Sequence, residues 1–183
     1  IIGYGGIVVM DNDQDHANRS VAEAVEKGIN YFDVAPAYGD GEAETKLGPA
    51  LAPYRKNSFL ACKTGERKRE GAAFELKQSL QRLRTDYLDL YQLHSISDVK
   101  EDVDVAFAKG GAMEVFIEAK KAGQIRYLGF SAHSEEAAVA AMEGLRTEVE
   151  SCRPQGQPRV SAELLVSNLG EQSVVFVNGY DTG

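Results

Sequence analysis

Four polar side chains stand near points where a short apolar stretch of the sequence stops. Asp33, Lys63 and His94 each close such a stretch, at intervals of 30 and 31 residues, and Tyr38 follows Asp33 by five. A phenol can donate a proton, and a neighbouring ammonium eases that donation. A carboxylate would hold the ammonium charged and oriented. If the chain folds these four groups together, they form an acid–base site rather than a device for stability alone.

The elements that must position these groups follow from the spacing, because about thirty residues make one strand–helix–strand unit. Short apolar runs bounded by turn residues predict strands, and apolar residues at helical spacing predict helices. The expected strands are 1–9, 30–34, 57–63, 87–93 and 125–130. The expected helices are 16–27, 42–52, 72–84, 111–122 and 135–145, with loops at 65–71 and 95–110.

Five alternations of strand and helix predict a parallel sheet. A doubly wound sheet would gather its ligands at one switch point. Here functional-looking residues follow several successive strands, which is typical of a barrel whose site is built from the C-terminal ends of many strands. The pattern therefore favours an α/β barrel.

Four motifs occur in order: FDVAPAYGDGEAETKLGPAL, ACKTGE, TDYLDLYQLH and GQIRYLGFSAHS. Together they resemble the aldo-keto reductases, over about residues 1–143. The catalytic tetrad of that family matches Asp33, Tyr38, Lys63 and His94 here. The resemblance also implies a (β/α)8 TIM-type barrel, of which this chain would hold an incomplete set of about five units.

The resemblance implies reduction of an aldehyde or ketone to an alcohol. A carbonyl then receives a hydride at carbon and a proton at oxygen, and fixed donors stabilise the charge that builds on that oxygen. Tyr38 would give the proton, Lys63 would promote its transfer, Asp33 would hold Lys63, and His94 would orient the substrate. None of these groups carries a hydride, so a cofactor must supply it. The resemblance implies that this cofactor is a nicotinamide, NADPH, with NADH as the other possibility.

Residues for that cofactor are less sharply defined. Ser131 corresponds to the serine of a family Ser-Asn pair that holds the carboxamide, but Ala132 replaces the asparagine. His133 fits a Ser-x-His version of the motif, or is simply a loop residue. Gly5 and Gly6 could let a cofactor approach the backbone. Their spacing does not fit a dinucleotide fingerprint, and small residues at a crowded strand end are the better interpretation.

Each candidate also has a structural interpretation. Asp33 would cap a loop, Tyr38 and Lys63 would be surface groups, and His94 would be a hydrogen-bonded structural histidine. The loop GERKREG at 65–71 carries three cations; it is a solvated loop, or it attracts an anionic ligand. No zinc-type ligand spacing occurs, so no metal is expected.

The composition of the chain limits which kinds of partner and location we expect. The chain has 183 residues, 43% hydrophobic and 26% charged, with a net charge of −8 and a pI near 5.0. That charge argues against nucleic-acid and anionic-membrane partners. We therefore expect a small-molecule carbonyl as partner, and leave the oligomeric state open. No apolar run spans a membrane. Two cysteines, Cys62 and Cys152, provide no disulfide framework, so we expect them unbonded in a cytoplasmic protein.

The last part of the chain is unlike the rest. We divide the chain into an N-terminal barrel part, 1–145, and an unassigned tail, 146–183, which is either a truncated end or joined pieces of a longer barrel. In the tail, 146–160 is expected as a loop, 161–170 as a helix and 173–177 as a strand, followed by a turn at 178–179. A full barrel needs about 250 residues. The alternative function is therefore a catalytically silent partial barrel acting as a structural or regulatory subunit.

Overall fold

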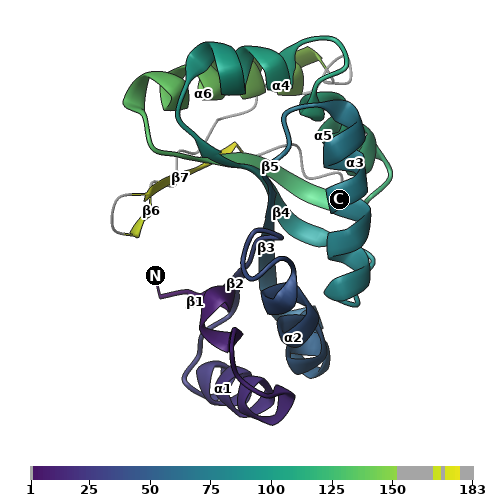
Figure 1. Ribbon diagram of the computed structural model, residues 1–183, viewed down its shortest axis with the longest axis vertical. Coiled ribbons are helices and arrows are strands. Elements are labelled where there is room, and N and C mark those ends of the chain that lie inside the picture. The colour runs from purple at the N-terminus through teal and green to yellow at the C-terminus, as the bar shows by residue number, and fades with distance from the viewer. Residues whose placement is uncertain (1, 152–166, 170–171, 178–183) are drawn as a thin grey trace.

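The computed structural model describes residues 2–151, 167–169 and 172–177. Within them, one seven-stranded sheet has the order β1-β2-β3-β4-β5-β7-β6 (Figure 1). β1 to β5 are parallel and adjacent in chain order, whereas β7 pairs antiparallel with β5 and β6 pairs antiparallel with β7. The strands are β1 Tyr4–Gly5, β2 Tyr31–Asp33, β3 Phe59–Thr64, β4 Leu88–Ile96, β5 Ile125–Ala132, β6 Ser167–Leu169 and β7 Gln172–Val177. This is the expected parallel α/β fold in its first five units.

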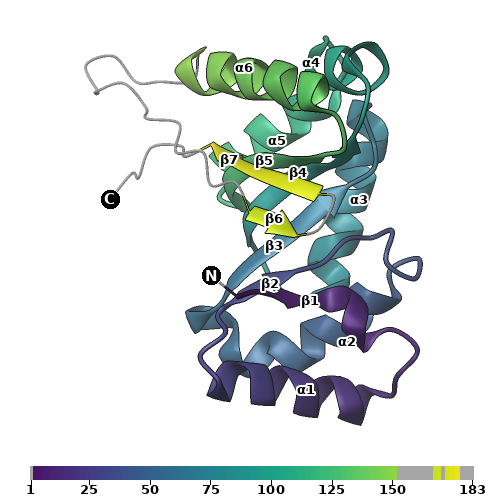
Figure 2. The same cartoon turned by 90° about the vertical axis from the view of Figure 1, so that its left-hand side faces the viewer.

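Helices connect the parallel strands. α2, α3 and α5 lie on one side of the sheet, and β7 and β6 extend the sheet beyond β5 (Figures 1 and 2). The helices are α1 Gln14–Glu26, α2 Glu42–Leu51, α3 Arg69–Arg82, α4 Val105–Phe107, α5 Ala112–Lys121 and α6 Glu135–Ser151. Two 3₁₀ helices, η1 Gly6–Val9 and η2 Ala52–Asn57, and a π-helix, η3 Val99–Asp104, complete the described elements. Among the described residues, no helix is long and apolar enough to cross a membrane.

Strand alternation sorts side chains between the two faces of the sheet. On the helix side, the Sγ of Cys62 contacts Glu44 of α2, Thr64 hydrogen-bonds to Glu75 of α3, and the ring of Tyr91 packs on that of Phe116 of α5, with 4.8 Å between centroids. The residues that alternate with these along β3 and β4 therefore point to the opposite, concave face of the sheet. Lys63 and His94 belong to that second set.

The expected strand at 1–9 is wrong beyond Gly5. β2 has only three residues, so β1 pairs through Tyr4↔Phe32 and Gly5↔Asp33 and then has no partner. The chain turns into η1, where Ile7 and Val8 are 53% and 52% exposed. The apolar run predicts a buried strand, but two of its side chains lie at the surface.

The expected loop at 95–110 is also wrong in most of its length. β4 continues to Ile96, and the chain then forms η3 and α4. The Asp98 side chain caps η3 by accepting from the backbone N–H groups of Lys100 and Glu101, at 2.8 Å each. Val103 and Ala106 are buried. Acidic composition alone suggested a loop, but two buried side chains and a cap are enough for helical turns.

The predictions for the tail, residues 146–183, are confirmed only in part. Residues 146–151 continue α6 instead of starting a loop, and residues 167–169 form β6 instead of a helix. The strand at 173–177 is confirmed as part of β7, because it pairs with β5 from Leu128↔Val177 to Ala132↔Ser173. The turn at 178–179 and Cys152 lie outside the described residues. Cys62 is a free, buried thiol.

Candidate active site

The first three candidate groups meet at the C-terminal ends of β2 and β3. The Nζ of Lys63 forms an ion pair with the Oδ1 of Asp33, and it lies 3.3 Å from the hydroxyl of Tyr38 and 3.4 Å from the carbonyl of Val34. The side chain of Lys63 is 3% exposed and that of Asp33 is 18% exposed. An almost fully buried ammonium is thus held by a carboxylate and directed at a phenol.

A left-handed turn places Tyr38. Gly39, Asp40 and Gly41 have φ values of 63°, 52° and 86°, and the carbonyl of Tyr38 accepts from the N–H of Ala43 at 3.2 Å. At Gly41, a Cβ atom would lie 2.3 Å from the guanidinium carbon of Arg82. The positive φ favours glycine there, and a Cβ would also displace the Arg82 guanidinium. The Gly-Asp-Gly sequence therefore turns the chain into α2 while leaving Tyr38 beside Lys63.

His94 completes the cluster from inside β4. Its ring meets the Tyr38 ring edge-on, with 5.8 Å between centroids and an interplanar angle of 83°. Burial, and to a smaller extent the nearby charges of Lys63, Arg67 and His133, together lower the pKa of His94 to about 4. The imidazole is therefore neutral at pH 7 and can offer a hydrogen bond without carrying a charge.

Two opposing effects set the charge of Lys63. Burial disfavours the ammonium and would lower the pKa of Lys63, but the charges and hydrogen bonds of Asp33 and Tyr38 together raise the pKa above its ordinary value. Lys63 therefore stays protonated at neutral pH, with Asp33 as its counter-ion. A fixed positive charge beside a phenol, with a neutral imidazole at the ring edge, can deliver a proton to an oxygen.

The structure brings Asp33, Tyr38, Lys63 and His94 together, as their spacing predicted. Ser131 is linked to this cluster through β4, because its buried Oγ accepts from the N–H of Ser95 at 2.9 Å. Its role toward a cofactor stays a prediction.

The glycines near β1 differ from each other. A Cβ on Gly6 would lie 3.0 Å from the carbonyl oxygen of Asp33 and 3.0 Å from a methyl of Val34, whereas one on Gly5 would meet only Ile7 at 3.9 Å. Gly6 thus fits the interpretation of a small residue at a crowded strand end. Contact of Gly5 or Gly6 with a cofactor stays a prediction. His133 is exposed, and its N–H donates to the carbonyl of Ile96 at 2.8 Å.

Sequence reasoning missed two groups at this end of the sheet, Arg67 and Gln92. Arg67 is not a solvated cation of the 65–71 loop: its Nε contacts the Oδ1 of Asp102 at 2.9 Å, and its Nη2 donates to the carbonyl of His94 at 2.7 Å. Partners 35 and 27 residues away leave no local signal. Gln92 is fully buried, with no hydrogen-bond partner for its amide, and pairs in register with Lys63. Its position two residues before His94 was the available clue.

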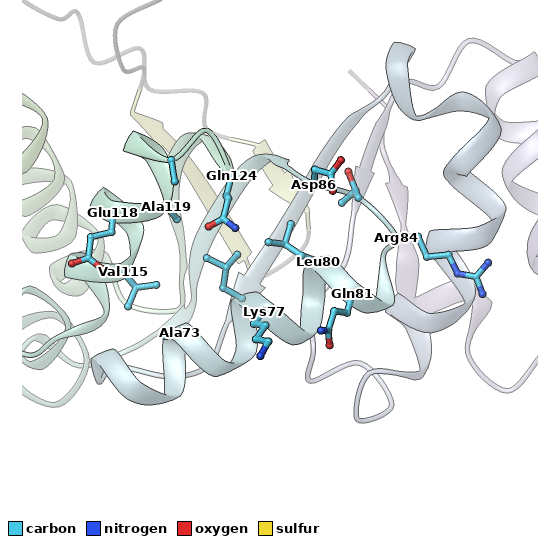
Figure 3. A pocket seen from close by; sticks show the side chains of 13 residues that line it. Ala73, Lys77, Leu80, Gln81, Arg84, Asp86, Val115, Glu118, Ala119 and Gln124 are labelled. Carbon is cyan, nitrogen blue, oxygen red and sulfur yellow. The ribbon is translucent and has the colours of Figure 1, made fainter.

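A groove of about 680 Å³ lies elsewhere, on the outer helical layer between α3 and α5 (Figure 3). Leu80 and Gln81 of α3 face it from one side and Val115 and Ala119 of α5 from the other. None of the four tetrad candidates lines it. The chemistry is therefore placed at the strand ends by the side chains and not by this groove.

Comparison with known proteins agrees with this arrangement. The sequence model of the Aldo/keto reductase family matches residues 2–155, so the match extends beyond the segment in which the four motifs occur. The chain belongs to this family. It is 36% identical over 138 residues to the uncharacterized oxidoreductase YqkF of Bacillus subtilis, covering 69% of this chain and 43% of that protein. It is 33% identical over 144 residues to the aldo-keto reductase YhdN of B. subtilis, covering 72% and 41%.

Solved structures are similar as well. The holo form of the aldo-keto reductase AKR11C1 from Bacillus halodurans matches with a TM-score of 0.62 and 35% identity, covering 72% of this chain and 45% of that one. An aldo/keto reductase from Klebsiella pneumoniae, solved with NADP and acetate, matches with a TM-score of 0.59 and 26% identity, covering 70% and 44%. The chain thus carries the N-terminal part of the family's (β/α)8 barrel, and it spans less than half the length of these relatives.

Proposed function

We propose that this chain reduces an aldehyde or ketone to an alcohol with NADPH as the cofactor. One observation supports this most directly: the ammonium of Lys63 lies between the carboxylate of Asp33 and the hydroxyl of Tyr38, with the ring of His94 against Tyr38. This combination is suited to protonating an oxygen at neutral pH.

Each group has a defined part in that step. Tyr38 donates its proton to the carbonyl oxygen. Lys63 stabilises the negative charge that the phenol retains, since the ammonium lies 3.3 Å away. Asp33 keeps Lys63 charged and fixed. Neutral His94 hydrogen-bonds to the same substrate oxygen and so orients the carbonyl against Tyr38.

The residues present fit the reacting end of a nicotinamide, which supplies the hydride when bound. The Oγ of Ser131 accepts from Ser95 and still has its own hydrogen to donate to a carboxamide oxygen. Gly5 leaves open space beside β1 for a ring to approach. The structures from K. pneumoniae hold NADP and NADPH, which favours NADPH here. NADH in its place would use the same reacting groups.

The alternative, a silent partial barrel, has less support. YqkF and YhdN are named as an oxidoreductase and an aldo-keto reductase, and neither name indicates a structural or regulatory subunit. We further propose a small-molecule carbonyl as the partner, rather than nucleic acid or a membrane, and a cytoplasmic location, which suits the free thiol of Cys62.

The test is Tyr38→Phe, which keeps the ring and removes the acid. With NADPH and 4-nitrobenzaldehyde, we expect turnover to fall about 10²–10⁴-fold. Cofactor affinity, measured by fluorescence titration, should barely change. Tyr54→Phe, in η2 before β3, is the matched control and should keep wild-type turnover.

Unchanged turnover in Tyr38→Phe would remove Tyr38 as the acid. A wild-type chain that neither binds NADPH nor oxidises it with any reactive aldehyde would support the silent barrel instead.

A further inference from the structure

We infer that Arg67 and Asp102 are positioning residues for His94, because Arg67 and Ser131 hold the two ends of the peptide unit that joins His94 to Ser95. The inference rests on the proposed function, since it assigns a purpose to the placement of His94. It also accounts for Arg67 in the charged 65–71 segment, which the acid–base cluster itself does not use.

The first observation is a bulge in β4. β4 and β5 pair at Leu93↔Phe130 and next at Ile96↔Ala132, so β4 advances three residues where β5 advances two. The extra residue falls at His94 and Ser95. Ser95 has a φ of 55°, a left-handed conformation that is unfavourable for a residue other than glycine. Such backbone persists only where the surroundings fix it.

The second observation is how the surroundings fix it. The carbonyl of His94 accepts from the Nη2 of Arg67 at 2.7 Å, and the N–H of Ser95 donates to the Oγ of Ser131 at 2.9 Å. These two atoms belong to one planar peptide unit. The peptide plane is therefore held by one hydrogen bond on each side. Its orientation sets the direction in which the His94 side chain points from the strand.

The third observation is that Arg67 is itself held. Its Nε contacts the Oδ1 of Asp102 at 2.9 Å, and the side chains of Arg67 and Asp102 are only 14% and 18% exposed. The other oxygen of Asp102 accepts from the N–H groups of Ser97 and Asp98, at 2.7 and 3.0 Å. The chain from Asp102 through Arg67 to His94 thus ties the segment after β4 to the strand end.

Only arginine can make this connection. Its planar fork presents Nε to Asp102 and Nη2 to His94 at the same time, whereas the single ammonium of lysine cannot reach both in that geometry. Loss of the fork frees the peptide plane, and the imidazole then shifts relative to the Tyr38 ring. A misplacement of about 1 Å in a reacting group can reduce a rate about 10²-fold.

The experiment compares Arg67→Lys and Arg67→Gln with Arg69→Gln. Arg69 is the matched control, because it lies two residues away and pairs with Glu114 and Glu118 of α5. We expect kcat to fall at least about tenfold in both Arg67 variants, with the dissociation constant for NADPH unchanged within about twofold. Arg69→Gln should leave both at wild-type values.

NMR of the imidazoles gives a second readout that needs no turnover. The chain has three histidines, so labelled histidine gives few resonances to assign. The positive charges of Lys63, Arg67 and His133 all lower the pKa of His94. Arg67→Gln should therefore raise that pKa above about 4, while Arg67→Lys should keep it low but still shift the His94 resonances. The comparison separates the effect of the charge of Arg67 on the pKa of His94 from the effect of its hydrogen bond to the peptide.

Asp102→Asn is the second variant, for use if Arg67→Gln fails to fold. It keeps acceptor oxygen for Ser97 and Asp98 but loses the ion pair, so it should shift His94 less than the Arg67 variants do. Wild-type His94 resonances in folded Arg67→Gln or Asp102→Asn would overturn the inference. So would equal losses in Arg67→Gln and Arg69→Gln. If the wild-type chain shows no turnover, the proposed function fails, but the NMR comparison still decides the positioning role.

Discussion

The two ends of the parallel sheet each bury a carboxylate against a cation, yet they are built differently. At the C-terminal end, Asp33 pairs with Lys63 and is 18% exposed. At the N-terminal end, Asp89 is 3% exposed, and its two oxygens take Arg55 and Arg126 at 2.9 Å each. The oxygen of Asp89 that faces Arg55 also accepts from the N–H of Leu60 at 2.9 Å.

The difference lies in what the cations contact. Arg55 donates to Thr85 and to the carbonyls of Ser58 and Tyr87, and stacks on the Tyr87 ring at 4.1 Å. Lys63 instead directs its charge at the Tyr38 hydroxyl, a group that can give up a proton. We therefore propose that similar pairs serve two purposes: one holds the N-terminal end of the sheet together, and the other places a positive charge beside the proton donor of the proposed reaction. Barrel enzymes divide stability and catalysis between these ends in the same way.

Among the variants that test this comparison between the two ends, Lys63→Met should have the largest effect. Removing the ammonium takes away the charge that stabilises the phenolate, so turnover should fall about 10²–10³-fold. Because Asp33 keeps some access to water, the free energy of unfolding should fall less than it does for Asp89→Ala. Steady-state NADPH oxidation and urea unfolding measure the two quantities. A stability loss as large as that of Asp89→Ala would erase the distinction between the ends.

Asp89→Ala should give the opposite result. It leaves two cations near a buried position and frees the Leu60 N–H, so we expect the free energy of unfolding to fall by about 3–5 kcal/mol. Turnover per folded molecule should stay at the wild-type value. Glu23→Ala, which removes an exposed pair with Lys27 in α1, is the control and should leave the urea midpoint unchanged. Loss of turnover in folded Asp89→Ala would mean that the two ends are coupled.

Acid should destabilise the C-terminal end through His94. Its pKa is about 4 in the folded chain against an ordinary 6.5, so the unfolded chain binds a proton first as the pH falls. The stabilisation is complete above about pH 6.5 and is lost as the pH falls through about 4. Unfolding curves at several pH values should show this slope, and His94→Gln should flatten it between pH 6.5 and 5. An unchanged slope would place the proton uptake elsewhere.

The smallest expected effect concerns Ser95. Its left-handed backbone costs a residue with a Cβ about 1–2 kcal/mol, part of which glycine avoids. Ser95→Gly should therefore be more stable than Ser95→Ala by up to about 1 kcal/mol in urea unfolding, after the larger entropy of unfolded glycine is included. A less stable glycine variant would show that the bulge is not strained.

Local sequence patterns were sufficient for the alternation of strands and helices, because strand and helix periods depend on neighbouring residues. They failed where pairing partners decide. η1 replaced a strand after Gly5 because β2 is too short to pair further, and β4 reached Ile96 because β5 continued beside it. Residues 167–169 became β6 because β7 offered an edge.

The sequence alone determined the identities and order of Asp33, Tyr38, Lys63 and His94. Asp33, Lys63 and His94 lie at or near the ends of strands whose apolar pattern is local, and Tyr38 follows Asp33 by five residues. The tertiary structure decided the protonation states and the orientation of these groups. It keeps Lys63 charged and His94 neutral, and it places Arg67 and Ser131 where they hydrogen-bond to one peptide plane. These properties depend on burial and on partners 25 to 36 residues apart. No local pattern encodes such distances, because only the parallel pairing of successive strand ends brings those residues together.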